Sequence, residues 1–246
     1  MSSARKTALV TGSSSGIGLG VAQGFLEDGW NVVLNGRDGE RLRNAAQRLG
    51  HAEHVAAVAG STAERATGEA MVRAARERFG SVDVLVNNAG EFGFKPFLDV
   101  SEQELEHYWN VNFKGTYVTT QAVARAMIAL GRGGSIVNIG TVLAGHSISW
   151  ARASAPLASK GAIHALTITL ASELASEGIR VNAVAPGFVR TPLLHNADPA
   201  PLEAAALLGR IGNVEDISAA VRYLSQSSFV TGHILNVDGG FATGRR

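Results

Sequence analysis

Short apolar runs rich in β-branched residues alternate along the chain with longer segments in which apolar residues recur at helical spacing. The first pattern predicts buried strands and the second predicts amphipathic helices. Strands are expected at 7–12, 31–36, 53–60, 82–90, 134–140, 180–187 and 233–240. Helices are expected at 16–29, 39–50, 63–80, 101–111, 115–130, 156–177 and 214–226.

This alternation of strand and helix is typical of right-handed crossover connections. It predicts an α/β fold in which a doubly wound, Rossmann-like parallel sheet of about seven strands carries helices on both faces. The chain contains no proline- or serine-rich linker, repeat or change of composition, so we expect one domain over residues 1–246. The mostly irregular stretch 188–213 is long for a plain connection, and loops of that length are often lids.

Composition narrows the class of protein. Apolar residues make up 46% of the 246 positions and charged residues 17%, which is enough apolar material for a sizeable core. The net charge of +1 gives no reason to expect a nucleic-acid or membrane partner, and no apolar stretch reaches the length of a membrane span. There is no cysteine, and the seven histidines lack metal-ligand spacing, so neither thiol chemistry nor a metal site is expected. The N-terminus lacks the apolar segment of a signal peptide, and the default expectation is a soluble, cytoplasmic protein.

The sequence TGSSSGIG at 11–18 links the first expected strand to the first expected helix. Gly12, Gly16 and Gly18 allow a tight turn in which backbone N–H groups approach an anion, and the serines between them add hydroxyl donors. The N-terminus of the following helix also favours phosphate. A glycine-rich turn that binds nothing is the alternative, but its place on the first βα connection favours a dinucleotide.

The end of the second expected strand bears on which dinucleotide binds. A carboxylate there would bind the ribose 2′-hydroxyl of NAD, whereas this strand ends in Gly36 and Arg37. Arginine pairs well with a 2′-phosphate, so we favour NADP (NADPH) over NAD as the cofactor. Two alternatives stay open: Arg37 as a solvated loop cation, and Asp38 as a carboxylate that would reverse the preference.

Several motifs, in matching order, resemble those of the short-chain dehydrogenase/reductase family and together cover nearly the whole chain. They are TGSSSGIG at 11–18, NNAG at 87–90, NVNFKG at 110–115, VNAVAPGFVRTP at 181–192, and the C-terminal pair GRIGNVEDI and VTGHILNVDGG. The resemblance implies an NAD(P)(H)-dependent oxidoreductase that acts on a small carbonyl or alcohol substrate.

The resemblance also implies which residues bind the cofactor. The family often has an aspartate after the third strand that meets the adenine amino group, and here Ser61 takes that place. Glu91, directly after the NNAG motif, is expected in solvent, with the pocket entrance as the alternative. The contacts carried over from the motifs involve Gly12, Ser14, Ser15, Gly16, Ile17, Gly18, Arg37, Asn88, Ala89, Gly90, Lys160, Pro186, Gly187, Val189 and Thr191.

In the catalytic centre of the family, a tyrosine four residues before a lysine transfers the proton, a serine orients the carbonyl, and an asparagine holds a water. Lys160 matches the lysine, Asn112 matches the asparagine, and Thr141 falls at or near the serine position. Position 156, where the tyrosine belongs, is Pro156, so the chain resembles a divergent member of the family. Proline fits the first turn of a helix and Ser154 is expected as the N-cap, so the exchange keeps the fold and removes the acid.

The loop 144–156 is expected to line the substrate side and holds candidates for the missing role. His146 is a candidate acid or base, with a surface or structural histidine as the alternative. Arg152 is a ligand for an acidic substrate group or a solvated loop residue, and Trp150 is a pocket wall or a core anchor. The three tyrosines, at 108, 117 and 223, are expected in helices away from this loop.

Three functions therefore stay open. The first is an NADP(H)-dependent oxidoreductase whose proton comes from a water, His146 or the substrate, which includes imines because an iminium accepts hydride without an enzyme proton at that step. The second is a nucleotide-binding pseudoenzyme that lost its reaction with the tyrosine. The third is a non-redox lyase or cyclase that uses the same pocket.

The expected partners are a small-molecule substrate and further copies of the chain. The resemblance implies a homotetramer, with a dimer as the alternative. One interface would be formed by the helices within 101–130 and 156–177, and another by the C-terminal strand region.

Overall fold

The computed structural model describes residues 5–195 and 198–244. Within them, seven strands form one parallel sheet in the order β3-β2-β1-β4-β5-β6-β7, which confirms the predicted doubly wound α/β fold. The strands are β1 (Thr7–Val10), β2 (Asn31–Gly36), β3 (Val55–Ala59), β4 (Val84–Asn87), β5 (Gly134–Ile139), β6 (Ile179–Pro186) and β7 (Ile234–Val237).

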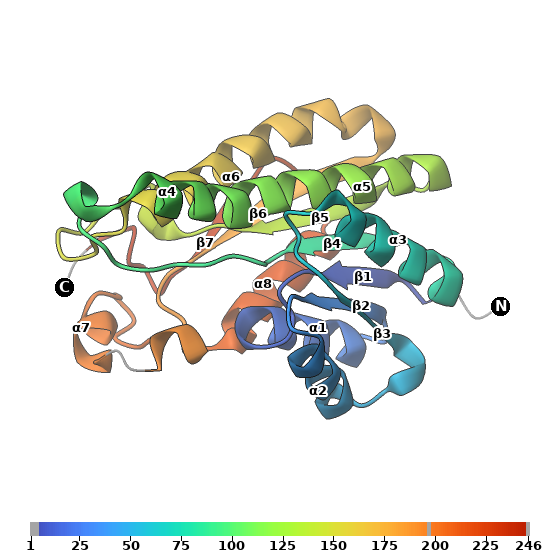
Figure 1. Ribbon diagram of the computed structural model, residues 1–246, viewed down its shortest axis with the longest axis horizontal. Coiled ribbons are helices and arrows are strands. Elements are labelled where there is room, and N and C mark those ends of the chain that lie inside the picture. Colours follow the sequence, from blue (N-terminus) through green and yellow to red (C-terminus); the bar gives the residue numbers. More distant parts are fainter. Residues whose placement is uncertain (1–4, 196–197, 245–246) are drawn as a thin grey trace.

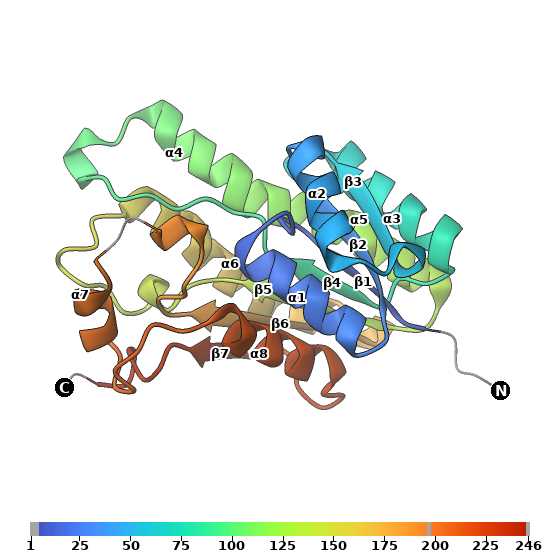
Figure 2. The same ribbon diagram turned by 90° about the horizontal axis from the view of Figure 1, so that it is seen from below.

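Helices cover both faces of the sheet (Figure 1). One face carries α1 (Gly16–Glu27), α2 (Gly39–Leu49) and α8 (Val214–Gln226). The other carries α3 (Arg65–Phe79), α5 (Gly115–Leu130) and α6 (Ser154–Glu173). The short helices α4 (Glu102–Tyr108) and α7 (Pro199–Ala204) lie toward the carboxyl ends of the strands, as Figure 2 shows from below.

Two apolar cores sandwich the sheet, because successive side chains of a strand point to opposite faces. Val10 packs with Phe25 of α1, whereas Leu9 packs with Met71 of α3 and Met127 of α5. All five side chains are fully buried, and each such burial stabilises the fold by about 1.5–3 kcal/mol. The central strands are therefore apolar on both faces, which is why their sequences read as continuous apolar runs.

Helix α8 closes the first core by packing along α1. Ile217, Val221 and Leu224 of α8 are fully buried in the same cluster as Phe25. At the helix surfaces, the hydroxyl of Ser218 donates to the Gly20 carbonyl 198 positions earlier, at 3.1 Å. The last long helix thus completes the packing of the first.

The structure differs from the predicted boundaries at α6. Ser154 is the first residue of this helix, and Ala153 occupies the N-cap, so the prediction of Ser154 as the cap is wrong. A single β-bridge pairs Lys95 with Ala153 and holds the chain extended up to that residue. The prediction that Pro156 lies in the first turn is confirmed, and there its missing N–H breaks no helical hydrogen bond.

A π-helical turn, Trp109–Lys114, joins α4 to α5, so the two helices expected at 101–111 and 115–130 form one continuous helical segment. Such turns carry an extra residue per hydrogen-bonded ring and recur at functional sites. The stretch 188–213 is not wholly irregular, because it contains the 3₁₀ turn Pro192–Leu194 and helix α7.

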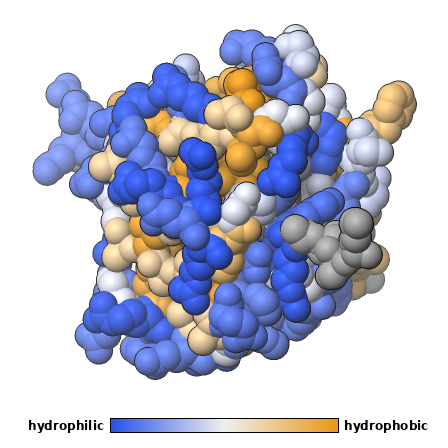
Figure 3. Space-filling view, turned by 90° about the vertical axis from the view of Figure 1, so that its right-hand side faces the viewer, coloured by the Kyte–Doolittle hydropathy of each residue, from blue (hydrophilic) through white to orange (hydrophobic). Residues whose placement is uncertain are grey.

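The two ends of the sheet present different surfaces. The end seen in Figure 3, at the amino ends of the strands, is mostly hydrophilic with smaller hydrophobic areas between. The other end carries the cavity described below. Over the described ranges, no helix is both long and apolar enough to cross a bilayer.

Candidate active site

The glycine-rich turn follows β1 at the carboxyl edge of the sheet. Gly12 has φ +61°, and a Cβ there would lie 2.7 Å from the Cα of Ala89, so no other residue fits without moving the backbone. The N-cap of α1, Ser15, makes no side-chain capping bond. The first-turn N–H groups of α1 are therefore left for an outside acceptor, which suits the pyrophosphate of a dinucleotide.

The serines of this turn divide by role. Ser13 is buried and structural, because its hydroxyl donates to the Val10 carbonyl at 2.9 Å and accepts from the Asn35 N–H at 3.0 Å. Ser14 lies next to Gly36 at the end of β2, and Ser15 faces the cavity. Only the latter two hydroxyls are placed to meet a ligand.

A cavity of about 520 Å³ opens between this turn and the ends of β4, β5 and β6. Four of the predicted cofactor residues do not line this cavity, namely Ser14, Gly18, Arg37 and Ala89. The structure brings the other predicted residues together around it. These are Gly12, Ser15, Gly16, Ile17, Asn88, Gly90, Thr141, Lys160, Pro186, Gly187, Val189 and Thr191.

Lys160 extends from α6 to the floor of the cavity. Its side chain is buried, and its Nζ donates to the Ile139 carbonyl at 3.0 Å. Burial lowers the pKa of Lys160 to about 8. A Cβ at Gly90 would lie 3.0 Å from this Nζ, so a glycine there lets the loop pass over the lysine. A buried cation that meets only a carbonyl suits ligand hydroxyls, such as those of the nicotinamide ribose.

Asn112 lies in the π-helical turn, fully buried and outside the cavity lining. Its Oδ1 accepts from the Glu91 N–H at 2.7 Å, and its Nδ2 donates to the Glu91 carbonyl at 3.0 Å and to the Ser159 Oγ at 2.9 Å. Ser159 in turn donates to the Pro156 carbonyl at 2.9 Å. The amide therefore ties the loop after β4 to the first turn of α6, a positioning role that the sequence did not indicate.

Pro156 lines a second cavity of about 90 Å³ rather than the large one. Tyr108 lines this small cavity too, and its hydroxyl lies against Gly93. The expectation that Tyr108 lies away from this loop is thus wrong, because α4 packs on the start of α6. Thr141 does line the large cavity, and its Oγ1 accepts from the Leu143 N–H at 3.3 Å.

His164 is a residue that sequence reasoning missed. It lies one turn after Lys160 on α6, with its Nε2 buried beneath Gly140, a residue of the cavity wall. Burial and the nearby charge of Lys160 lower the pKa of His164, which favours the neutral ring. The i, i+4 spacing from Lys160 was the available signal.

Aromatic side chains form the wall on the substrate side. Phe94 and Phe188 line the cavity, and the ring of Trp150 lies near both, 5.8 Å from Phe188 in a stacked arrangement and 6.5 Å from Phe94. Trp150 is thus an outer support of the pocket wall. His146 and Arg152 are exposed and lie outside the cavity lining.

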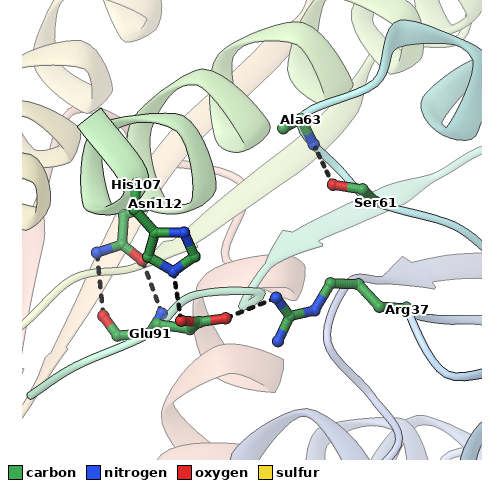
Figure 4. A network of polar contacts seen from close by, with 6 residues as sticks. All are labelled: Arg37, Ser61, Ala63, Glu91, His107 and Asn112. Atoms are coloured by element: carbon green, nitrogen blue, oxygen red, sulfur yellow. Dashed lines mark hydrogen bonds and ion pairs between the residues drawn. The ribbon is translucent and has the colours of Figure 1, made fainter. Parts of the chain in front are cut away.

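Arg37, at the end of β2, points toward Glu91 and forms an ion pair with it, with 2.6 Å between Nη1 and Oε1 (Figure 4). The other carboxylate oxygen accepts from His107 Nε2 at 2.7 Å. Burial works to raise the pKa of Glu91, but the bond from His107 and the charge of Arg37 outweigh it and lower that pKa. Glu91 lines the cavity, so the expectation of a solvent-facing residue is wrong.

Asp38 and Ser61 serve local turns. The Asp38 carboxylate caps α2 by accepting from the N–H groups of Glu40 and Arg41, at 2.9 and 3.0 Å. The hydrogen bond from Arg41 holds the pKa of Asp38 below its ordinary value. Ser61 Oγ accepts from the Ala63 N–H at 3.3 Å (Figure 4). Both bonds to Asp38 end on Oδ1, so this oxygen is engaged in capping α2.

A sequence model of the family described as short chain dehydrogenase matches residues 6–201. The chain belongs to this family. Galactitol 2-dehydrogenase (L-tagatose-forming) of Cereibacter sphaeroides is 38% identical over 245 residues, which covers 95% of this chain and 94% of the relative. The 3alpha-hydroxysteroid dehydrogenase of Mediterraneibacter gnavus is also 38% identical, over 242 residues, which covers 95% and 96%.

Solved structures agree with this membership. The crystal structure of 3-ketoacyl-(acyl-carrier-protein) reductase from Brucella melitensis, complexed with NADH, has a TM-score of 0.89 and 32% sequence identity. The match covers 98% of this chain and all of the other. This short-chain dehydrogenase is therefore an NAD(P)-dependent oxidoreductase with the fold of its family.

Proposed function

We propose that this short-chain dehydrogenase is an NADP(H)-dependent reductase of carbonyl or iminium compounds that carry an apolar group next to the reacting carbon. It would act within one domain spanning residues 1–246. The observation that carries the proposal is the single cavity that joins the glycine turn, Lys160 and Thr141 to an aromatic wall. Each of these parts suits a different portion of a dinucleotide and its substrate.

The residues would share the ligand as follows. The first-turn N–H groups of α1 at Gly16 and Ile17 would hold the pyrophosphate, and the Arg37 guanidinium would bind the 2′-phosphate. Lys160 would donate to the nicotinamide ribose, and the Thr141 hydroxyl would donate to a carbonyl oxygen or accept from an iminium N–H. The nicotinamide supplies a hydride when bound; the chain's part is to hold the substrate carbon against it.

The proton source is the part in which this chain departs from its family. Pro156 carries no proton, and loss of a positioned acid costs about 10²–10⁴ in rate. An iminium substrate avoids that cost, because its nitrogen already carries the charge that hydride transfer neutralises. For a ketone, the proton would come from water or from a group on the substrate rather than from the exposed His146.

The aromatic wall favours apolar substrates over polyols. Phe92, Phe94 and Phe188 face the cavity, as do Leu143 and Leu193. Each matching apolar group of the substrate adds about 25 cal/mol per Å² that it buries. Of the two relatives, one is named for an apolar steroid and the other for the polyol galactitol, and the aromatic wall suits the steroid better.

The test uses paired substrates with one carbon skeleton, an aryl-alkyl ketone and its cyclic imine, with NADPH consumption as the measurement. We expect the wild-type protein to reduce the imine at least tenfold faster than the ketone. Pro156→Tyr should raise ketone reduction and leave imine reduction within about twofold. If the wild-type protein consumes no NADPH with either the ketone or the imine, the proposal is overturned.

Pro156 also supports a second candidate, a pseudoenzyme that binds NADP(H) for a regulatory purpose. The glycine turn and the buried Lys160 would be kept for binding alone. This candidate predicts NADPH binding by calorimetry together with no turnover across carbonyl and imine substrates. Robust turnover by the wild-type protein excludes it.

We further propose that the protein is a homotetramer, or failing that a dimer. Several large apolar side chains along α4, the π-helical turn, α5 and α6 are exposed, among them Leu105, Trp109, Tyr117 and Ile168. Burial of such a surface against a second copy would stabilise an oligomer. Light scattering coupled to size exclusion tests this, and a monomer at micromolar concentration would contradict it.

A further inference from the structure

The ion pair between Arg37 and Glu91 crosses the place where the cofactor would lie. Arg37 directly follows β2, Glu91 follows β4 by four residues, and β1 lies between these two strands in the sheet. The phosphate-binding turn follows β1. The ion pair therefore spans the end of β1, and Figure 4 shows the guanidinium of Arg37 reaching across to the carboxylate.

Three hydrogen bonds hold Glu91 in this position, two from Asn112 and one from His107. Asn112 fixes its backbone by accepting from its N–H at 2.7 Å and donating to its carbonyl at 3.0 Å. His107 donates to its Oε2 at 2.7 Å. Its side chain is 33% exposed, against 64% for that of Arg37, so the carboxylate is the fixed partner and the guanidinium the adaptable one.

We infer that Glu91 is a cofactor-selectivity residue, whose carboxylate competes with the 2′-phosphate of NADP for the guanidinium of Arg37. The inference rests on the proposed function, since it needs Arg37 to bind that phosphate. A phosphate brings more charge than a carboxylate and displaces it, while Glu91 keeps its bond to His107. NAD has only a hydroxyl at this place and gains nothing from the exchange, so Glu91 narrows the preference for NADP over NAD.

The change that isolates this effect is Glu91→Gln, which keeps the shape and removes the charge. The pair is partly exposed and therefore screened by water, so its removal should change the affinity for NADPH only moderately. We therefore expect the Kd of NADPH to fall by about three- to tenfold, with the Kd of NADH changed by less than about twofold. Glu106→Gln, which removes an exposed carboxylate from the same segment as His107, is the matched control and should leave both constants unchanged.

The measurement is calorimetric titration with NADPH and NADH, repeated with the fragments 2′,5′-ADP and 5′-AMP, which lack the nicotinamide. Arg37→Gln should lower the affinity for NADPH and for 2′,5′-ADP by at least about tenfold. In the double variant, Glu91→Gln should no longer change the ratio of NADPH to NADH affinity, because the two residues act through one contact. Thermal melts of each variant check that the fold is intact.

The two substitutions test the NADP preference and the role of Glu91 separately. If Arg37→Gln leaves the ratio of NADPH to NADH affinity unchanged, the proposed NADP preference fails, and the inference fails with it. If Arg37→Gln lowers the ratio but Glu91→Gln does not raise it, only the inference is overturned. An equal gain for both dinucleotides in Glu91→Gln would also overturn it, because Glu91 would then hinder entry without selecting.

Discussion

Replacing Lys160 with methionine should make the free protein more stable and a poorer binder. The Lys160 side chain is buried, and its pKa falls from an ordinary 10.5 to about 8 because burial disfavours the ammonium. That difference corresponds to about 3 kcal/mol of destabilisation at neutral pH. Methionine has a similar shape and no charge, but the bond to the Ile139 carbonyl is lost, at a cost of about 1 kcal/mol.

The net gain at pH 7 is therefore about 2 kcal/mol, or roughly 4–8 °C in Tm for a chain of this length. The sign of the pH dependence follows from proton binding. Between the folded pKa near 8 and the unfolded value of 10.5, the unfolded chain binds more protons, so wild-type stability contributed by this group rises with pH. The advantage of Lys160→Met should be constant below pH 8 and shrink between pH 8 and 10.5.

The assay is thermal melting at pH 7 and pH 10, at one protein concentration, with Lys114→Met as the control at an exposed position. Calorimetry with NADPH should show affinity lowered by about tenfold to a hundredfold, since a charge-assisted hydrogen bond is removed. A Tm for Lys160→Met that is equal to or below the wild-type value at pH 7 would refute the reasoning. An undiminished advantage at pH 10 would refute the assigned cause.

Three further substitutions test other parts of the site. Tyr108→Phe should leave turnover within about twofold, because this phenol lines the small cavity; a loss of tenfold or more would identify it as the proton donor. Gly12→Ala should lower Tm and abolish NADPH binding, whereas Gly29→Ala, at φ +80° in open space, should cost only about 1–2 kcal/mol; equal effects would contradict the close approach at Gly12. Ser159→Ala should lower the free energy of unfolding in urea by about 1–3 kcal/mol, since the buried Nδ2 of Asn112 loses one of its two acceptors; a change below about 0.3 kcal/mol would contradict a structural role.

Local patterns predicted most of the fold because the signals were themselves local. Helix α8 spans Val214–Gln226 as expected, because its apolar residues recur at helical spacing. The start of α6 was misplaced because a bridge from Lys95, far away in the chain, decides where the extended segment ends at Ala153. Tertiary contact overrode the capping preference of Ser154.

The backbone turns of the candidate site could be predicted from the sequence, whereas the contacts between its side chains could not. The glycine turn and Lys160 could be located from motifs alone, and both line the cavity. The ion pair between Arg37 and Glu91 could not, because it depends on side-chain conformations of two loops that the sheet brings together. The aromatic wall has the same origin, since its rings come from separate loops.

The packing of α8 on α1 sets the moment during synthesis at which the chain can finish folding. Translation proceeds at about 5–20 residues per second, so Ile217 leaves the ribosome roughly 10–40 s after Val21 and Phe25. Throughout that interval the face of the sheet that carries α1 and α2 lacks α8, and the apolar residues of α1 that pack on α8 are open to chaperones or to other chains. The speed of translation between residues 25 and 217 therefore determines how long the first helix waits for its partner.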